Sequence, residues 1–196
     1  MKFLESKRIK TITIGAAEDT SRVGLELQFS VCKDKNNNYI PTKLRHGGRH
    51  QVSRQENECP LGTKLISDIH THPMMNLGGK GSLQSQARLS DSDIVLAKRL
   101  NKITCVAQKV KKTNEVVVKC ISPKSIKNLL GDMYKGNPTL KKNTKNDEEL
   151  LLYYGRKMMF SEEKSKPYIK EKRFKLNDLI SGKPKKSKKN TFSFEY

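Results

Sequence analysis

Two histidines, His70 and His72, lie one residue apart and directly before a proline in the stretch DIHTHPMMN. Alternate side chains of a β-strand point to the same face, so both imidazoles are expected on one side of a strand, with Thr71 on the other. Two imidazoles on one face can chelate one metal ion. Pro73 ends the strand and places the pair where a loop opens. Two partly exposed histidines at a strand end would show the same pattern.

A catalytic zinc site needs three protein ligands and an open position for water. Ser90 and Asp93 stand at the start of a predicted helix, LSDSDIVLAKRLNK, with the spacing of a capping box. Asp93 could supply the third ligand, and the Ser90 hydroxyl could donate to an oxyanion. A helix cap without a metal explains the same two residues. The two interpretations are compatible, because a cap fixes the direction of the Asp93 side chain.

A metal-dependent hydrolase also needs a base beside the attacking water, whose pKa the metal lowers towards about 7. Glu26 is the first candidate, because it lies on the polar face of a predicted strand, residues 23–31, whose other face is apolar. An ordinary solvent-facing strand residue would look the same. Glu18, in the stretch AAEDT, is the reserve candidate. The strand register favours Glu26.

These residues together resemble the motif of the JAMM (MPN+, JAB-domain) zinc metalloproteases, E…H-[ST]-H-P…S-x-x-D, over about residues 8–125. The resemblance implies zinc as the cofactor and a water as its fourth ligand. It also implies a role for each residue: His70, His72 and Asp93 as zinc ligands, Glu26 as general base, and Ser90 as oxyanion stabiliser. In that mechanism the deprotonated water attacks the scissile carbonyl, and Glu26 then protonates the leaving amine.

The family resemblance further implies an α/β fold, a cytidine-deaminase-like mixed sheet sandwiched by helices. It implies hydrolysis of isopeptide or peptide bonds, such as removal of a ubiquitin-like modifier from a protein substrate. Two features are those of a divergent prokaryotic or archaeal member. The first is the segment between His72 and Ser90, residues 73–89, whose 17 residues exceed the usual length and would shape the substrate cleft. The second is Phe29, which stands where the family usually has glycine.

Hydrophobic periodicity predicts one mixed α/β domain over residues 5–125. The predicted strands are 8–14, 23–31, 39–44, 63–72, 103–110 and 114–121, and the predicted helix is 89–102. The stretch RIKTITI alternates, so a strand rather than a helix is expected ahead of Glu26. Residues 126–196 are predicted to form a basic C-terminal extension, with a linker at 131–145, a helix at 146–160 and a lysine-rich tail.

The net charge of +20 is the strongest feature of the composition. Such a chain associates with polyanions unless salt screens it, so a nucleic acid or an acidic protein could be a partner. The rival functions are therefore a nucleic-acid-associated protein with the same fold, as in the RadC-type branch of the family, and a zinc-binding pseudoenzyme. The tail KPKKSKK could contact nucleic acid, but it lacks the interleaved aromatic residues that stack on bases.

The chain contains no apolar run long enough to span a membrane and no signal-peptide core, so a cytoplasmic location without membrane contact is expected. The four cysteines have no C-x-x-C spacing, and in a reducing compartment they are expected to be free thiols: Cys32, Cys59, Cys105 and Cys120. His46 and His50, in RHGGRH, are predicted to lie in a basic loop that contacts substrate or an anion, with a second metal as the alternative.

Overall fold

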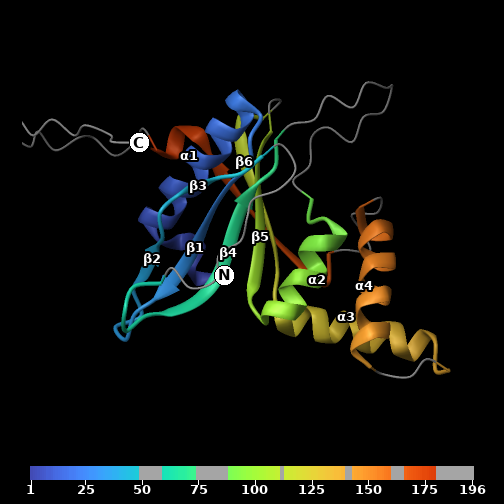
Figure 1. Cartoon of the computed structure of the whole chain (residues 1–196). Coiled ribbons are helices and arrows are strands. Elements are labelled where there is room, and N and C mark those ends of the chain that lie inside the picture. The colour runs from blue at the N-terminus through green and yellow to red at the C-terminus, as the bar shows by residue number, and fades with distance from the viewer. Residues whose placement is uncertain (49–58, 74–87, 111–112, 140–142, 160–165, 180–196) are drawn as a thin grey trace, which may run out of the picture.

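The computed structural model describes residues 1–48, 59–73, 88–110, 113–139, 143–159 and 166–179. In this part of the chain a mixed sheet lies between helices on both faces, which confirms the mixed α/β class (Figure 1). The strands are β1 (Leu27–Lys33), β2 (Tyr39–Pro41), β3 (Arg45–His46), β4 (Lys64–Thr71), β5 (Ile103–Val110), β6 (Glu115–Ile121) and β7 (Ile169–Lys175). Their order is β2-β1-β4-β5-β6-β7, with β3 also paired to β1.

The pairing of β4 with β5 is parallel, and the other pairings are antiparallel. The connection between β4 and β5 contains a helix, as parallel neighbours require. The helices are α1 (Lys7–Val23), α2 (Asp91–Leu100), α3 (Pro123–Gly136) and α4 (Thr144–Met159), with short 3-10 helices η1 (Lys2–Glu5) and η2 (Leu176–Leu179). In Figure 1, α1 covers one face of the sheet, and α2, α3 and α4 lie on the other side.

The predicted strand at 8–14 is wrong, because these residues belong to α1. Alternation over seven residues is too short to distinguish the two periods. The buried positions Ile9, Thr13, Ala17 and Thr20 repeat every three to four residues and form a single helical face. The helix ends at Gly24, whose φ of 74° lies in the left-handed region that favours glycine. A helix therefore does precede Glu26.

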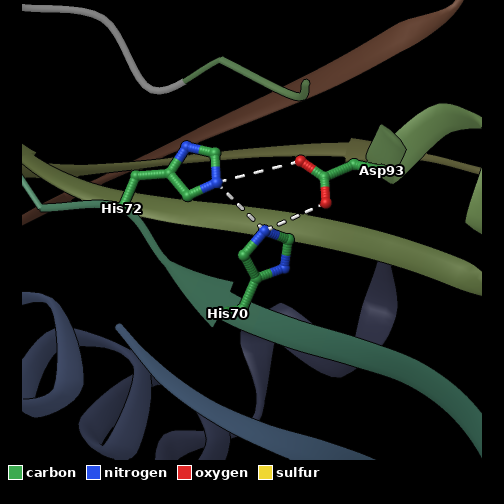
Figure 2. Close-up of side chains that lie close together, drawn as sticks. All are labelled: His70, His72 and Asp93. Carbon is green, nitrogen blue, oxygen red and sulfur yellow. Dashed lines mark hydrogen bonds and ion pairs between the residues drawn. The ribbon is translucent and has the colours of Figure 1, made fainter. Parts of the chain in front are cut away.

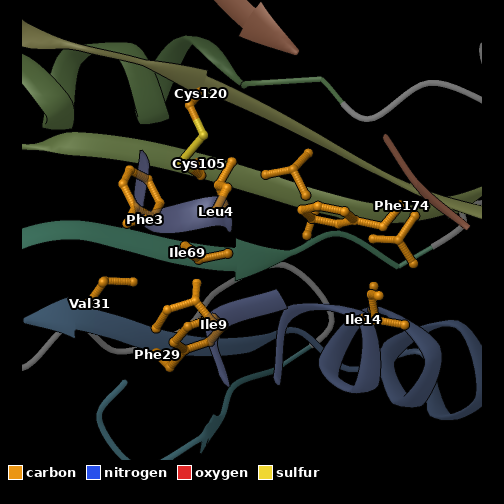
Figure 3. Packing of buried hydrophobic residues seen from close by; sticks show 14 of the residues in the cluster. Phe3, Leu4, Ile9, Ile14, Phe29, Val31, Ile69, Cys105, Cys120 and Phe174 are labelled. Atoms are coloured by element: carbon orange, nitrogen blue, oxygen red, sulfur yellow. A yellow bond between two sulfur atoms is a disulfide. The ribbon is translucent and has the colours of Figure 1, made fainter. Parts of the chain in front are cut away.

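The face of the sheet that α1 covers is an apolar core (Figure 3). Side chains of α1 and η1 pack there against the alternate residues of the central strands that point towards them. The buried members include Phe3, Leu4, Ile9, Ile14, Phe29, Val31, Ile69, Ala107, Val118 and Phe174. Because this core fills the space between α1 and the sheet, it fixes β1 and β4 in the register that orients the opposite face.

A second core lies between α2, α3, α4 and the strands β5 and β6. It contains Val106, Val117 and Ile121 from the sheet and Ile94, Ile126, Leu129 and Leu151 from the helices. α2 and α4 are also joined by a bidentate pair, in which Arg99 donates to both carboxylate oxygens of Glu148 at 2.8 and 2.6 Å. The helices thus cover the β5–β6 half of this face.

Elements beyond residue 125 belong to both cores. α3 occupies part of the predicted linker at 131–145, so that prediction is wrong, whereas the helix predicted at 146–160 is confirmed by α4. β7 pairs with β6 along its whole length and contributes Phe174 to the core beneath α1. The predicted tail begins after residue 160, so β7 and η2 contradict its first part, whereas residues 180–196, with the stretch KPKKSKK, lie outside the described residues. The boundary between 5–125 and 126–196 as separately folding units stays a prediction.

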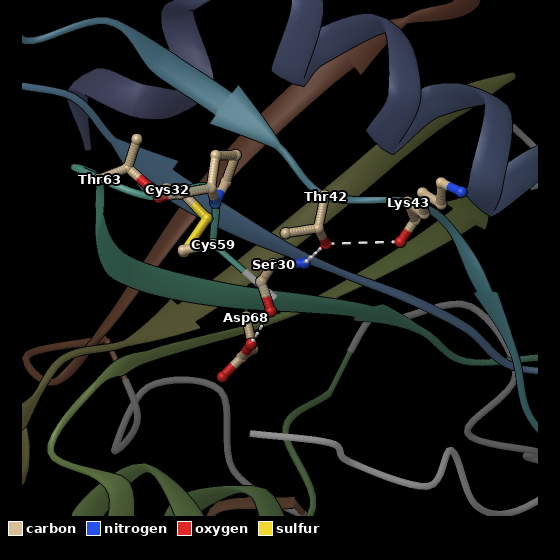
Figure 4. The surroundings of a disulfide bond; sticks show 8 residues. Ser30, Cys32, Thr42, Lys43, Cys59, Thr63 and Asp68 are labelled. Atoms are coloured by element: carbon tan, nitrogen blue, oxygen red, sulfur yellow. Dashed lines mark hydrogen bonds between the residues drawn. A yellow bond between two sulfur atoms is a disulfide. The ribbon is translucent and has the colours of Figure 1, made fainter. Parts of the chain in front are cut away.

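All four cysteines are paired, so the expectation of free thiols is wrong. Cys105 and Cys120 are directly opposite in the β5–β6 hairpin and form one disulfide, within the core of Figure 3. Cys32 of β1 forms the other with Cys59, which ties the chain before β4 to the neighbouring strand (Figure 4). The strand register of β5 and β6 brings Cys105 and Cys120, 15 positions apart, into contact, whereas Cys59, 27 positions after Cys32, lies ahead of β4.

Candidate metal centre

The side chains of His70, His72 and Asp93 converge at one point on the α2 face of the sheet (Figure 2). The His70 Nε2 and His72 Nε2 atoms are 3.1 Å apart. Asp93 Oδ1 lies 3.2 Å from His70 Nε2, and Asp93 Oδ2 lies 3.8 Å from His72 Nε2. His70 and Asp93 are each 4% exposed, so two of the three ligands are deeply buried.

β4 positions the two histidines. Its buried centre pairs with β1 on one side and β5 on the other, which fixes the direction of the His70 side chain. His72 lies just past the end of β4, but its backbone N–H donates to the Ala107 carbonyl of β5 at 3.2 Å. The extended pairing therefore continues through both residues. As predicted from the alternation, both imidazoles point to one face, whereas Thr71 points to the other and bonds Thr20 of α1.

α2 positions Asp93. Ser90 is its N-cap and accepts a hydrogen bond from the Asp93 backbone N–H, and the Asp93 carboxylate accepts one from the Ser90 backbone N–H. The predicted capping box is confirmed. Each bond satisfies one N–H that a helix start leaves without an intrahelical partner. The same bonds hold the Asp93 carboxylate in the first turn, where it faces the two imidazoles.

The arrangement fits a metal ion. Ligand atoms at about 2.0–2.2 Å from a tetrahedral Zn²⁺ are separated from one another by about 3.4 Å. The two imidazole nitrogens are 3.1 Å apart, each lies 3.2 or 3.8 Å from one of the two Asp93 oxygens, and one ligand atom from each residue falls within 4.8 Å of the others. Imidazole nitrogen with carboxylate oxygen is a donor set that suits Zn²⁺ and other late divalent metals. The three residues therefore form a buried group that could hold a metal ion.

The electrostatics of the group also favour a cation. Burial and the adjacent His70 lower the pKa of His72 from 6.5 to about 4, although the Asp93 carboxylate opposes this. Burial raises the pKa of Asp93, but His70, His72 and the Ser90 hydroxyl outweigh it, so that pKa lies below its usual range. At neutral pH the cluster therefore presents an anionic carboxylate and a neutral His72, which are the protonation states that metal ligation requires.

Glu26 is buried, at 8% exposed, so the alternative of a solvent-facing residue is wrong. The β1–β4 register sets Gln28 directly across from His70 on the same face of the sheet. Glu26 lies just before β1, which begins at Leu27, so the predicted strand at 23–31 starts too early. Its backbone N–H donates to the Gly48 carbonyl, and its own carbonyl accepts from the Gly47 N–H. If the alternation of β1 is extended back by two residues from Gln28, the Glu26 side chain points towards the face that carries the histidines.

Glu18 lies elsewhere. It is on α1, on the opposite side of the sheet, and its carboxylate accepts a hydrogen bond from Lys109 at 3.0 Å. Lys109 follows Ala107 by two residues on β5 and so shares its α1-facing side. The reserve candidate is thus separated from His70 by the sheet itself.

Ser90 lies beside Asp93, but its hydroxyl is already engaged. The Ser90 Oγ donates to Asp93 Oδ2 at 2.8 Å while accepting from the Asp93 backbone. In this arrangement Ser90 orients the carboxylate. Donation to an oxyanion would require the hydroxyl to turn away from Oδ2, so that role stays a prediction.

Other predicted features are further from the centre or undescribed. His46 belongs to β3 and pairs with Leu27 of β1, whereas His50 lies outside the described residues, as does most of the 73–89 segment. Sequence reasoning missed two buried polar residues on the metal-facing side, Gln28 and Asp68. The alternation of β1 and β4 was their signal, because each lies two residues from a motif residue on the same face.

No family model, no curated protein and no solved structure matches this chain. Among the described residues, no helix is both long and apolar enough to cross a membrane.

Proposed function

We propose that the protein is a zinc-dependent metallopeptidase of the JAMM type that hydrolyses isopeptide or peptide bonds. The observation that supports this most strongly is the convergence of His70, His72 and Asp93, in the order and residue types of that family's motif. The burial of Glu26, two residues before Gln28 of β1, supports its assignment as the fourth member. The family normally has a helix ahead of this glutamate, and α1 precedes Glu26 where the sequence predicts a strand.

In this proposal His70, His72 and Asp93 would hold Zn²⁺, which when bound would supply Lewis-acid chemistry at an attacking water and at the scissile carbonyl. Glu26 takes the proton of the attacking water and later delivers it to the leaving amine. Ser90 holds Asp93 in place and, when its hydroxyl turns, donates to the developing oxyanion. The sheet and α2 exclude solvent from His70 and Asp93, which strengthens these interactions.

The first test is metal content. Protein purified without chelator is expected to contain about one zinc per chain, as a three-ligand site implies. His70→Ala and Asp93→Ala should each lose the metal. If wild-type protein neither contains zinc nor binds added zinc, the metallopeptidase proposal fails.

The second test is Glu26→Gln, with Glu18→Gln as the matched control. The probe is a fluorescent peptide whose lysine ε-amino group carries the C-terminal glycine of a ubiquitin-like protein. Glu26→Gln should retain zinc and lose about 10²–10⁴ in hydrolytic rate, because amide nitrogen cannot accept the proton. Glu18→Gln should match wild type, since Glu18 pairs with Lys109 on the other side of the sheet.

Three results would contradict the mechanism. Zinc-loaded wild type that cleaves no isopeptide or peptide probe would leave a zinc-binding pseudoenzyme. Inactivity of Glu18→Gln alone would move the base to α1. Full activity of both variants would exclude both carboxylates.

The +20 charge favours a second candidate, a nucleic-acid-associated protein that uses the same metal centre. Such a protein should bind a generic DNA or RNA duplex in low salt, with affinity that falls steeply as salt rises. Weak binding at 50 mM salt, measured by fluorescence anisotropy, would argue against this candidate and leave the metallopeptidase as the sole proposal.

A further inference from the structure

Two complementary atoms beside the metal centre have no hydrogen-bond partner in the described part of the chain. One is His70 Nδ1, the ring nitrogen that faces away from Asp93 and His72. The other is Gln28 Oε1. Both atoms are buried, and a buried polar atom without a partner costs about 1–3 kcal/mol. Such atoms in a native protein call for a specific explanation.

The two residues are direct neighbours across strands. Gln28 of β1 is the antiparallel partner of His70 of β4, so their side chains leave the sheet on the same face. Directly opposite residues have Cβ atoms about 4.5–5.5 Å apart, a distance that a glutamine side chain can bridge. Gln28 is 6% exposed and His70 is 4% exposed, so water does not easily serve either of them.

The chemistry of the pair is determined by the ligand role of His70. A neutral imidazole carries one N–H, and metal binding through Nε2 places that hydrogen on Nδ1. Nδ1 is then a donor, and Gln28 Oε1 is an acceptor without a donor. A ligating histidine generally donates its second N–H to a protein acceptor, which fixes the tautomer and the ring orientation.

We propose that Gln28 is the positioning residue for His70: its Oε1 accepts the Nδ1–H hydrogen bond when Nε2 binds the metal. This inference rests on the metal centre of the proposed function. It assigns Gln28 a role in metal affinity, and none in proton transfer. The bond forms through side-chain rotation of Gln28, with β1 and β4 unchanged.

Asp68 is the competing acceptor. It is buried on the same face, two residues before His70. Its Oδ1, however, already accepts a hydrogen bond from Ser30 at 2.6 Å, across the same strand pair (Figure 4). Gln28 Oε1 is the acceptor that lacks a donor. Variants of Asp68 and Ser30 therefore serve as matched comparisons on the same two strands.

The experiment measures the zinc dissociation constant by competition with a chromogenic chelator, in full-length protein. Gln28→Leu keeps the approximate volume and removes the acceptor, so its dissociation constant should rise about 10- to 100-fold. Gln28→Glu restores an acceptor and should bind zinc within a few-fold of wild type. Ser30→Ala, one position along the same face, should leave zinc affinity unchanged.

A tautomer measurement separates positioning from packing. Two-dimensional NMR of protein labelled with ¹⁵N in its histidines should show the His70 hydrogen on Nδ1 in the wild type. Gln28→Leu should lose that protected Nδ1–H signal, whereas Gln28→Glu should retain it. If substitution at residue 28 acted only by loosening the packing, Gln28→Leu and Gln28→Glu would both lose the Nδ1–H signal.

Failures of the two proposals are distinguishable. Absence of zinc binding in wild type would overturn the metal centre and, with it, the role of Gln28 in metal affinity. Zinc binding by wild type with unchanged affinity in Gln28→Leu would overturn the role of Gln28 alone. If zinc affinity fell in Asp68→Asn and was unchanged in Gln28→Leu, the positioning role would belong to Asp68, and the inference would also be overturned.

Discussion

The two faces of the central sheet are built from the same strands but differ in chemistry. Towards α1, β4 presents Ser67, Ile69 and Thr71, and the space is closed by apolar residues and the Cys105–Cys120 disulfide. Towards α2, the same strand presents Asp68 and His70, with His72 just beyond it. One face is a closed core, and the other holds a polar cluster with buried atoms that lack partners.

The difference shows how one strand can carry both a core and a site. Consecutive side chains of a strand point to opposite faces, so core residues and ligands alternate along the sequence. Packing of Ile69 beneath α1 fixes the backbone, and the fixed backbone sets the direction of His70. The apolar face therefore acts as the support for the polar face, and the two should respond differently to mutation.

The largest expected effect is that of truncation, which removes contributions to both faces at once. Ending the chain at residue 125 deletes α4, β7 and most of α3, together with Leu151 and Phe174 from the two cores. It also turns β6 into an edge strand, whose hydrogen-bonding groups on the side of β7 lose their partners. The fragment should show no cooperative unfolding transition by circular dichroism.

Truncation at residue 179 is the control, because it leaves every described helix and strand in place and should unfold like the full chain. A stable, zinc-binding 1–125 fragment would instead show that residues 126–196 are a separate extension, as the composition shift predicts.

Adjacent substitutions on β4 compare the faces directly. Ile69→Ala removes a fully buried side chain from the α1 core and should lower the free energy of unfolding by about 2–5 kcal/mol. It should leave zinc-induced stabilisation intact. His70→Ala should abolish that stabilisation, because a ligand that binds only the folded state raises the melting temperature by an amount that grows with the logarithm of its affinity.

The measurement is the thermal melting temperature with and without a small excess of zinc. If Ile69→Ala and His70→Ala lose the zinc-induced rise in melting temperature equally, the α1 face affects metal binding directly. The view that it only supports the polar face would then be wrong.

The sequence predicted the polar face better than the apolar one. The features of the polar face depend on patterns within a few residues of the sequence, which do not require knowledge of distant contacts. They are the motif residues, the strand that contains His70 and the capping box at Ser90. The α1 face depends on long-range pairing. Alternation in RIKTITI could not reveal a helix, since Ile9 and Thr13 become one buried face only when packed against β1 and β5.

The disulfides were missed for a related reason, although one had a visible signal. Cys105 and Cys120 are equally distant from the centre of the hairpin turn, so a hairpin drawn from the sequence would have paired them. Cys32 and Cys59 had no such signal, because β2, β3 and a long connection separate them. The expectation of free thiols relied on the expected cytoplasmic location, and the compartment stays a prediction.

Acid should weaken the polar face before the apolar one. The pKa of His72 is about 4 in the folded chain and 6.5 in the reference state. Between these values the unfolded chain binds the additional proton, so the stability of metal-free protein should fall as pH falls from 6.5 towards 4. Asp93, whose pKa is also lowered, adds a further loss only below its reference value of 3.8.

Urea denaturation across this pH range measures the effect. His72→Gln should flatten the slope between pH 6.5 and 4, while Ile69→Ala should lower the whole curve without changing its slope. An unchanged slope in His72→Gln would mean that another group is responsible.

Ser90 should show the smallest effect on stability and the sharpest division of roles. Ser90→Ala removes the helix cap and should cost about 1 kcal/mol of stability, as N-cap substitutions typically do. It also frees Asp93 Oδ2 from its 2.8 Å hydrogen bond, so zinc affinity should weaken modestly.

Ser90→Asn is the matched variant, because asparagine caps helices well and has no hydroxyl. If Ser90 serves only as the cap, Ser90→Asn should restore both stability and hydrolysis. If its hydroxyl stabilises the oxyanion, Ser90→Asn should recover stability yet remain about 10²-fold slower on the isopeptide probe, with zinc bound.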